Sequence, residues 1–294
     1  MANRVVCSGV MEPEGPVCTE DGQVYLVEMA KARACVSRVD AKGQRHEVAR
    51  PGGRPNGLTI DGDGNLWTAG GEQESVVCLS PTGKILKRFV GPDGDPYLWP
   101  NDVAFGPDGH LYLTDSGILP DDFIDGQAIR SDYKTIPYHG RIFDIDPKSG
   151  RVLRTLDTGL RFTNGIAFDA DNILYVNETL SGNVYRYDVF GQAAPKREVF
   201  GNVINGAPSA FVGPDGMAFG QDGRLYCTVF GQGDVTVLDR GGKVVDRIKT
   251  NGQRPTNIAF REGADGAVVT DLGTNALEEI AVPCRGRALY KPKL

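Results

Sequence analysis

The chain has 294 residues, 24% of them charged, with 39 glycines and a formal net charge of −6. This acidic balance, without a basic run, argues against nucleic acid and anionic membranes as partners. No segment approaches the ~20 apolar residues of a membrane-spanning helix, and we expect no signal peptide, so we predict a cytoplasmic protein that acts on a small molecule.

A short motif recurs along the chain, in which a polar residue stands at or near the start of a short apolar run. The polar residues occupy positions 14, 56, 101, 164, 215 and 257, at intervals of 42, 45, 63, 51 and 42 residues. The six copies are Glu14-Gly15-Pro16-Val17, Pro55-Asn56-Gly57-Leu58, Pro100-Asn101-Asp102-Val103, Thr163-Asn164-Gly165-Ile166, Pro214-Asp215-Gly216-Met217 and Pro255-Thr256-Asn257-Ile258. Repeats at this pitch indicate one structural unit that is used several times.

Each unit has the composition of a β-hairpin that is followed by further strands. Seven residues after the polar residue of the first five copies comes an Asp that Gly or Asn follows: Asp21, Asp63, Asp108, Asp171 and Asp222. Asp-Gly between apolar runs favours a hairpin, because Gly accepts the positive φ of a tight turn. Four antiparallel strands in about 40–50 residues make a propeller blade. The sequence therefore predicts an all-β fold, a six-bladed β-propeller of four-stranded antiparallel blades that forms a single domain over residues 1–294.

A β-sandwich and a solenoid are the alternative folds. A sandwich does not need six near-copies at one pitch, and a solenoid would need more uniform repeats with recognisable caps. The last unit is short, and the N-terminal run Arg4–Val10 belongs to no earlier unit. We therefore expect the N-terminal strand to complete the last blade and to close the ring, which removes an exposed sheet edge.

The third unit contains an insertion at about 117–139. The interval from Asn101 to Asn164 is about 20 residues longer than the common pitch of such repeats, and the surplus is rich in apolar residues. Loops of this length are usually functional or disordered, and this one is too apolar for a disordered linker. We interpret it as a lid over a partly apolar pocket; a packed surface loop or a subunit contact is the alternative.

The first strand of each propeller blade lines the central channel, so the six aligned polar residues should form a ring at one mouth. They are Glu14, Asn56, Asn101, Asn164, Asp215 and Asn257. Asn and Asp also begin strands because they suit turns, but six converging polar groups without a partner would be costly to bury. Carboxylate and amide oxygens are hard donors that suit Ca²⁺, Mg²⁺ or Mn²⁺, whereas Zn²⁺ prefers His and Cys.

We therefore predict one divalent metal ion held by Glu14, Asn101, Asn164 and Asp215, with Ca²⁺ fitting best and Mg²⁺, Mn²⁺ or Zn²⁺ as alternatives. Asn56 and Asn257 would then support the ligands or face the substrate. The sequence leaves the oligomeric state open between a monomer and a small homo-oligomer.

These motifs, taken together, resemble the senescence-marker-protein/gluconolactonase/regucalcin family over roughly Glu14 to Asp271. The resemblance implies a six-bladed propeller with one catalytic divalent metal, and hydrolysis, most often of sugar lactones. It implies that Glu14, Asn164 and Asp215 hold the metal, and that Asn101 contacts metal or substrate. Members of the family often carry Arg two residues before that Asn. Trp99 stands there instead, which favours a less polar or planar substrate.

The resulting hypothesis is a metal-dependent hydrolase that opens a lactone of a non-sugar or aromatic kind, with Asp215 and Asn101 as catalytic residues. The metal would polarise the carbonyl, and either Asp215 or a metal-held hydroxide would activate the attack. Candidate substrate contacts are Asn56, Trp99, Asn257, Asp115 and Tyr138. The alternatives are a phosphotriesterase-like or other esterase at the same site, and a non-catalytic binding propeller that the metal only stabilises.

Overall fold

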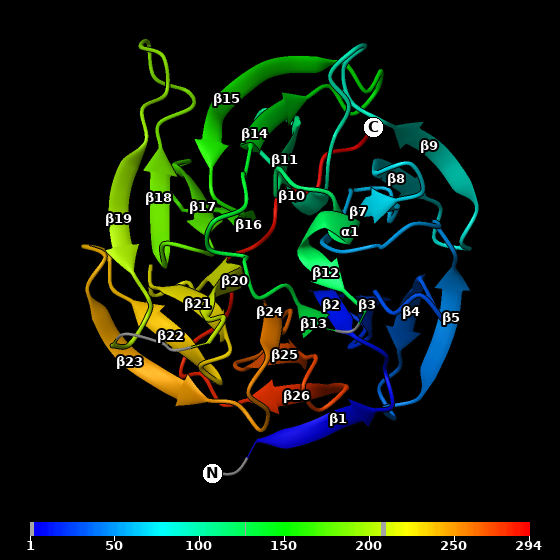
Figure 1. The fold of residues 1–294 in the computed structure, drawn as a ribbon. Helices are drawn as coiled ribbons and strands as arrows, with labels where there is room; N and C mark the ends of the chain where they lie inside the picture. The colour runs from blue at the N-terminus through cyan, green and yellow to red at the C-terminus, as the bar shows by residue number, and fades with distance from the viewer. Residues whose placement is uncertain (1–2, 127, 207–209) are drawn as a thin grey trace.

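A computed structural model describes residues 3–126, 128–206 and 210–294, and these form six four-stranded antiparallel sheets arranged around one centre (Figure 1). The predicted six-bladed β-propeller is confirmed. The one helix among the described residues is the single turn α1 (Pro120–Phe123). No described helix has the length and apolar character that crossing a bilayer requires.

The blades follow one another along the chain, and each runs from an inner to an outer strand. Blade one comprises β2 (Pro13–Cys18), β3 (Val24–Glu28), β4 (Cys35–Val39) and β5 (Arg45–Ala49). Blade two comprises β6 (Leu58–Ile60), β7 (Leu66–Gly71), β8 (Ser75–Leu79) and β9 (Ile85–Phe89). Blade three comprises β10 (Pro100–Phe105), β11 (Leu111–Asp115), β14 (Gly140–Ile145) and β15 (Val152–Leu160). Blade four comprises β16 (Thr163–Phe168), β17 (Leu174–Glu178), β18 (Asn183–Tyr187) and β19 (Glu198–Asn202). Blade five comprises β20 (Gly213–Phe219), β21 (Leu225–Phe230), β22 (Asp234–Leu238) and β23 (Val244–Lys249).

The sixth blade joins the two ends of the ring. It consists of β24 (Pro255–Phe260), β25 (Ala267–Asp271), β26 (Ala276–Ile280) and the N-terminal strand β1 (Arg4–Ser8). β1 pairs with β26 from Arg4 opposite Glu279 to Ser8 opposite Ala276. The predicted closure by the N-terminal strand is therefore confirmed.

The hairpins between first and second strands explain the repeated spacing of Asp and aromatic residues. In blade three, Gly109 takes a φ of +78° in the turn, and the Tyr112 hydroxyl donates to Asp108 at 2.9 Å. Tyr226 donates to Asp222 in the same way at 3.0 Å. In blades three and five, the aromatic residue four positions after the turn Asp thus buries its ring and satisfies its hydroxyl at the turn, whereas Trp67 and Tyr175 donate to Asp61 and Asp169, six positions before them.

Side-chain hydroxyls tie the inner strands of neighbouring blades together. Thr114 donates to the carbonyl of Asn164 at 2.7 Å, and Thr228 donates to the carbonyl of Thr256 at 2.8 Å. Thr256 in turn donates to the carbonyl of Pro13 at 2.7 Å, across the closure of the ring. These bonds fix the position of each inner strand relative to the next, and thereby the side chains that face the channel.

Two segments lie at opposite ends of the channel. The insertion after β11 folds into α1 and the short strands β12 (Ile124–Asp125) and β13 (Ala128–Ile129), which lie in front of the middle of the ring in Figure 1; Gln127 lies outside the described residues. The C-terminal segment 281–294 runs along the inner hairpin turns at the other end, where Gly286 bridges to Gly220 and the amide of Gly62 donates to the carbonyl of Pro292 at 2.8 Å.

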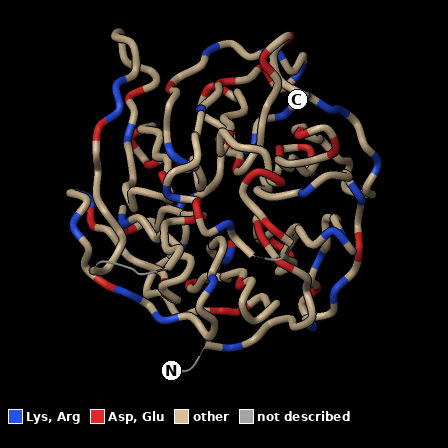
Figure 2. The backbone as a smooth tube through the Cα atoms, in the orientation of Figure 1, with Lys and Arg blue, Asp and Glu red and all other residues tan. Residues whose placement is uncertain are grey.

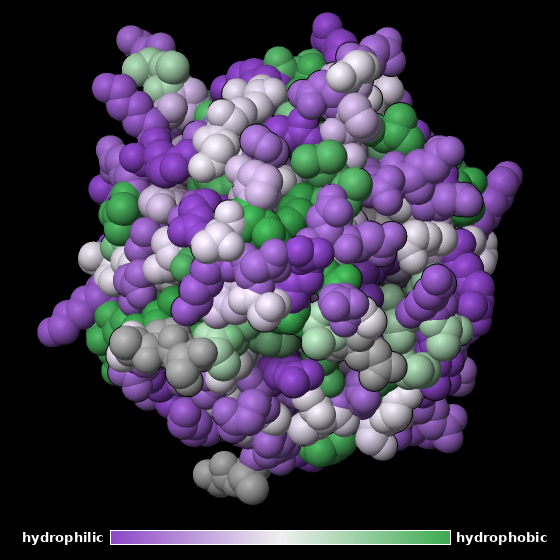
Figure 3. All heavy atoms as spheres, viewed as in Figure 1, coloured by the Kyte–Doolittle hydropathy of each residue, from purple (hydrophilic) through white to green (hydrophobic). Residues whose placement is uncertain are grey.

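Charges of both signs are spread over the propeller. Figure 2 shows Lys and Arg alternating with Asp and Glu around the rim, so the face in view is not dominated by one sign. Figure 3 shows apolar residues gathered on this same face around the insertion.

Candidate metal centre and adjoining cleft

The predicted ring residues stand at the start of the inner strands, at the end that carries the insertion. In blade three, Pro100 pairs with Asp115, where the insertion begins, and Asn101 is the next residue. Glu14, Asn101 and Asn164 are 2%, 3% and 4% exposed, and Asp215 is partly exposed. Polar groups this deeply buried need partners.

Two hydroxyl groups set the orientation of the two asparagines. Asn101 Nδ2 donates to Ser116 Oγ at 3.0 Å, and Asn164 Nδ2 donates to Thr179 Oγ1 at 3.2 Å. Each hydroxyl donates onward to a backbone carbonyl of the next blade, Ser116 to Thr163 at 3.0 Å and Thr179 to Pro214 at 2.8 Å. The side-chain amide nitrogens are thus held by the channel wall, and Asn101 Oδ1 is buried without a hydrogen-bond donor among residues 3–126, 128–206 and 210–294.

Three carboxylates converge near these amides. Burial, together with the charges of Asp215 and Asp102, raises the pKa of Glu14 well above its usual range. Burial also raises the pKa of Asp215 well above its usual range; a hydrogen bond with Asn164 opposes the rise and the charge of Asp102 adds to it. Burial raises the pKa of Asp102 to about 7. Like charges at close quarters disfavour ionisation, and a cation among them would reverse that preference.

The donor set fits a hard divalent cation. Glu14 and Asp215 offer carboxylate oxygens, Asn164 contacts Asp215, and Asn101 offers an oxygen that no group in the described part of the chain satisfies. Oxygen ligands of this kind suit Ca²⁺ or Mg²⁺, and oriented hydroxyls behind the ligands are the usual support of a metal site.

The register of the last blade corrects one alignment from the sequence. Asn257 N bonds to Thr270 Oγ1 at 3.1 Å, as Asp102 N bonds to Thr114 Oγ1 at 3.0 Å. Asn257 is therefore the counterpart of Asp102, and Thr256 occupies the ring position. The mistake arose because Thr and Asn are adjacent polar residues and the turn that follows is longer in this blade.

Asp102 and Asn257 together make a second polar layer next to the ring. Asn257 Nδ2 donates to Glu14 Oε2 at 3.3 Å, and the same carboxamide contacts Asp102. The counterparts in other blades are glycines, and a Cβ on Gly57 or Gly216 would clash with Asp102 or Asn257 respectively. Sequence reasoning gave Asp102 no role, although its signal was visible: it is an acid where four of the other copies carry Gly.

Asp115, predicted as a substrate contact, is engaged by the chain itself. It is fully buried, one oxygen accepts the amides of Trp99 (2.9 Å) and Gly117 (3.0 Å), and the other accepts the amide of Leu98 (2.9 Å) and an Arg141 N–H (2.7 Å). With both oxygens occupied, Asp115 holds the loops on either side of it and is not available to a substrate.

Tyr138 and Trp99 belong to an apolar cluster that joins the insertion to the propeller. The Tyr138 hydroxyl donates to the carbonyl of Tyr133 at 2.7 Å, and its ring packs with Phe162. The Trp99 ring packs edge-on against Phe123 at 5.9 Å and Phe162 at 5.4 Å. Tyr138 therefore fixes the fold of the insertion, whereas Trp99 also lines a cleft.

The cleft has a volume of about 500 Å³ and lies between the insertion and the loops of blades one to three. Trp99 and Pro100 line it and directly precede Asn101, and Arg54 lines it two residues before Asn56. The cleft thus adjoins the ring without enclosing it. Asn56 itself is buried, and its backbone N–H donates to the carbonyl of Ala69 at 2.9 Å.

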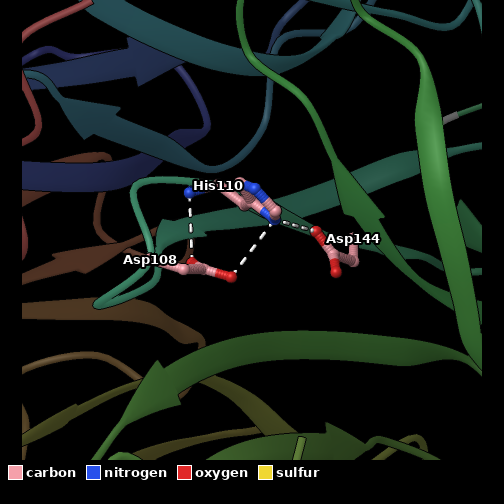
Figure 4. Close-up of side chains that lie close together, drawn as sticks. All are labelled: Asp108, His110 and Asp144. Atoms are coloured by element: carbon pink, nitrogen blue, oxygen red, sulfur yellow. Dashed lines mark hydrogen bonds and ion pairs between the residues drawn. The ribbon is translucent and has the colours of Figure 1, made fainter. Parts of the chain in front are cut away.

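A separate cluster joins Asp108, His110 and Asp144 at the other end of blade three (Figure 4). His110 Nδ1 lies 2.9 Å from Asp144 and 3.1 Å from Asp108. The other oxygen of Asp144 accepts from Arg154 at 2.7 Å, and Tyr112 donates to Asp108. These contacts brace the β10–β11 turn, and they leave no buried acceptor in need of a cation.

Comparison with known proteins places the chain among β-propellers with related sequences. The family model described as SMP-30/Gluconolactonase/LRE-like region matches residues 12–271. The chain is 24% identical over 279 residues to Lactonase drp35 of Staphylococcus haemolyticus, which covers 91% of this chain and 79% of that protein.

Solved structures show the same fold at low identity. A gluconolactonase of Xanthomonas campestris superposes with a TM-score of 0.77 and 21% identity, over 95% of this chain and 89% of that one. A calcium-binding regucalcin of Agrobacterium tumefaciens gives a TM-score of 0.75 and 19% identity, over 100% of this chain and 98% of that one.

Proposed function

The chain belongs to the SMP-30/gluconolactonase/LRE-like family, and we propose that it is a divalent-metal-dependent hydrolase that opens a lactone. The observation that carries this proposal is the buried Oδ1 of Asn101, for which the described residues supply no donor and which stands in the same ring as Glu14, Asn164 and Asp215. The lactonase name of the drp35 relative and the gluconolactonase neighbour support the reaction class.

Glu14, Asn101, Asn164 and Asp215 would hold the metal, and Ca²⁺ suits their oxygens best. A cation bound there supplies positive charge beside the ester carbonyl and so favours the charge that develops on its oxygen. Asn101 and Asn164 enter this role already oriented, because Ser116 and Thr179 hold their amide nitrogens.

Asp215 is the proposed base. Its carboxylate, positioned by Asn164, accepts a proton from a water molecule as that water attacks the carbonyl carbon. The bond from the carbonyl carbon to the ring oxygen then breaks, and the ring oxygen takes the proton that Asp215 accepted, which yields the open hydroxy acid and returns Asp215 to its carboxylate form.

The insertion at 117–139 is proposed as the lid of this site, and the cleft beneath it as the place of the remainder of the substrate. Trp99, Leu119 and Ile124 give the cleft an apolar wall, which suits a non-sugar or aromatic lactone. Cytoplasmic location and a monomeric or small homo-oligomeric state stay predictions from the sequence.

The test is hydrolysis of a panel that runs from gluconolactone to aryl-fused lactones, with aryl phosphotriesters alongside, in the presence of Ca²⁺. We expect ring opening of at least one lactone, and its loss in Asp215→Asn with the circular dichroism spectrum unchanged. Turnover of phosphotriesters alone would assign another ester class to the site, and no turnover of any ester by folded protein would favour a binding role.

A further inference from the structure

Two side chains of blade four hold the backbone of Asp215 from both sides. Thr179 Oγ1 donates to the carbonyl of Pro214 at 2.8 Å. Asn177 Nδ2 donates to the carbonyl of Asp215 itself at 2.6 Å. These carbonyls belong to the two peptide planes that flank Asp215, and a residue has only two soft backbone torsions. With both planes held, the direction in which the Asp215 side chain leaves the backbone is set.

The sheet of blade five does not hold Asp215 in this way. β20 and β21 pair at Pro214 and again from Met217, with a shift of register between them, so Asp215 lies in a bulge. A bulge leaves a residue outside the regular ladder and changes the direction of its side chain. The hydrogen bond from Asn177, in the neighbouring blade, therefore supplies a constraint that the ladder lacks.

The surroundings of Asn177 are shaped for this contact. A Cβ on Gly165 would lie 2.4 Å from the carbonyl oxygen of Asp215 and 3.0 Å from Asn177 Nδ2, so a side chain there would displace the hydrogen bond. Asn177 Nδ2 also donates to Cys227 Sγ at 3.4 Å. A reversed amide would bring two acceptor oxygens together at Asp215, so these contacts assign the nitrogen to this side.

Blade four departs from its neighbours at this position. Asn177 is the fourth residue of β17, and three other blades carry threonine at the fourth residue of the second strand: Thr114, Thr228 and Thr270. Asn177 is fully buried, and its Oδ1 has no donor in the part of the chain that the structure describes. An unsatisfied buried acceptor lowers stability, so stability alone would not favour asparagine here. Local departures of this kind are expected at functional sites.

We propose that Asn177 is a positioning residue for Asp215, and that its side-chain amide, by holding the Asp215 carbonyl, directs the carboxylate toward the metal and the attacking water. The role rests on the proposed lactonase function, because that function makes Asp215 a metal ligand and the base. Asn177 acts only through Asp215.

The test compares two substitutions that differ in a single hydroxyl group. Asn177→Val removes every donor, whereas Asn177→Thr introduces the hydroxyl that Thr114 uses for the carbonyl of Asn164 at 2.7 Å. Tyr187→Phe is the matched control, since it removes another hydrogen bond between blades, from Tyr187 to Asp157 at 2.8 Å. Ca²⁺ dissociation constants are measured by calorimetry, Tm by circular dichroism, and kcat and KM on an accepted lactone.

We expect Asn177→Val to weaken Ca²⁺ binding by roughly 10–100-fold and to lower kcat more than it raises KM, because a misdirected base is felt in the transition state. Its Tm should fall no further than that of Tyr187→Phe, which keeps the wild-type Ca²⁺ affinity. Asn177→Thr should stay within about threefold of the wild-type affinity, since a neutral hydroxyl can replace the amide donor.

Wild-type affinity and kcat in Asn177→Val would overturn the role, and so would equal impairment of Asn177→Val and Asn177→Thr, which would assign the effect to side-chain shape. Loss of affinity in Tyr187→Phe as well would assign it to blade packing in general. Calorimetry needs no turnover, so a wild type that binds Ca²⁺ but opens no lactone would contradict the proposed function, while the affinities of the variants still decide the role of Asn177.

Discussion

Without divalent cations, the free energy of unfolding of the protein should fall as the pH rises from 5 to 8. Glu14, Asp102 and Asp215 have pKa values raised by burial and by one another, so the fold prefers their protonated forms. A carboxyl group of this kind stabilises the fold fully below its unfolded pKa, and that contribution is lost as the pH rises through its folded pKa. The sign is opposite to that of an ion-paired carboxylate.

Asp102 sets the magnitude. Its pKa moves from an ordinary 3.8 to about 7, a difference of about 3 pH units, which corresponds to roughly 4 kcal/mol at most. For a chain of this size that is a fall in Tm of roughly 6–7 °C at most. Excess Ca²⁺ should restore stability at pH 8, because the cation pairs with the ionised carboxylates.

The assay is thermal unfolding followed by circular dichroism between pH 4.5 and 8.5, with chelator and then with excess Ca²⁺. Burial also raises the pKa of Glu278 to about 7, so this residue adds to the loss of stability with rising pH. The difference in pH dependence between the wild type and Asp102→Asn therefore isolates the contribution of the channel carboxylates. Asp132→Asn, at an exposed pair with Arg130, serves as the control. A chelated wild type whose stability is flat or rises from pH 5 to 8 would refute the reasoning.

Three further results are expected. Ser116→Ala and Thr179→Ala should each weaken Ca²⁺ binding by roughly 10–100-fold in calorimetry, because the side-chain amides of Asn101 and Asn164 lose their hydrogen-bond acceptors. Ser149→Ala, on the surface, should leave the affinity unchanged. Equal affinity in all three variants would show that the hydroxyls do not orient the ligands. Gly216→Ala should destabilise the fold or displace Asn257, lowering both Tm and Ca²⁺ affinity, while Gly241→Ala, which meets only a side chain at 3.3 Å, should change neither. Deletion of residues 285–294 should lower the Tm by several degrees through loss of the contacts at Gly62 and Gly220, and an unchanged Tm would assign those contacts no weight.

The propeller could be predicted because five of its six hairpins repeat one local sequence pattern. Each Asp-Gly or Asp-Asn turn and its following aromatic residue report on contacts within a few residues of one another, as Tyr112 and Asp108 do. The closing strand β1 was predictable from a count of strands.

The parts of the site that were missed depend on contacts between blades. Asp102 meets Asn257 across the channel, and no local pattern links residues so far apart in the chain. From the sequence, an acid at position 115 could equally be a substrate contact or a structural residue. Only its hydrogen bonds from the backbone amides of Leu98, Trp99 and Gly117 identify Asp115 as part of the scaffold.

The central claim is that one divalent cation in the ring of Glu14, Asn101, Asn164 and Asp215 is required for lactone opening. The most direct measurement is proton release from an accepted lactone by metal-stripped protein as Ca²⁺ is added back, with bound metal counted in the same samples. The account predicts that activity rises in proportion to bound metal up to one ion per chain, and that Glu14→Gln loses the bound ion and the activity together. Full activity in the stripped protein, or activity that reaches its maximum independently of bound metal, would contradict it.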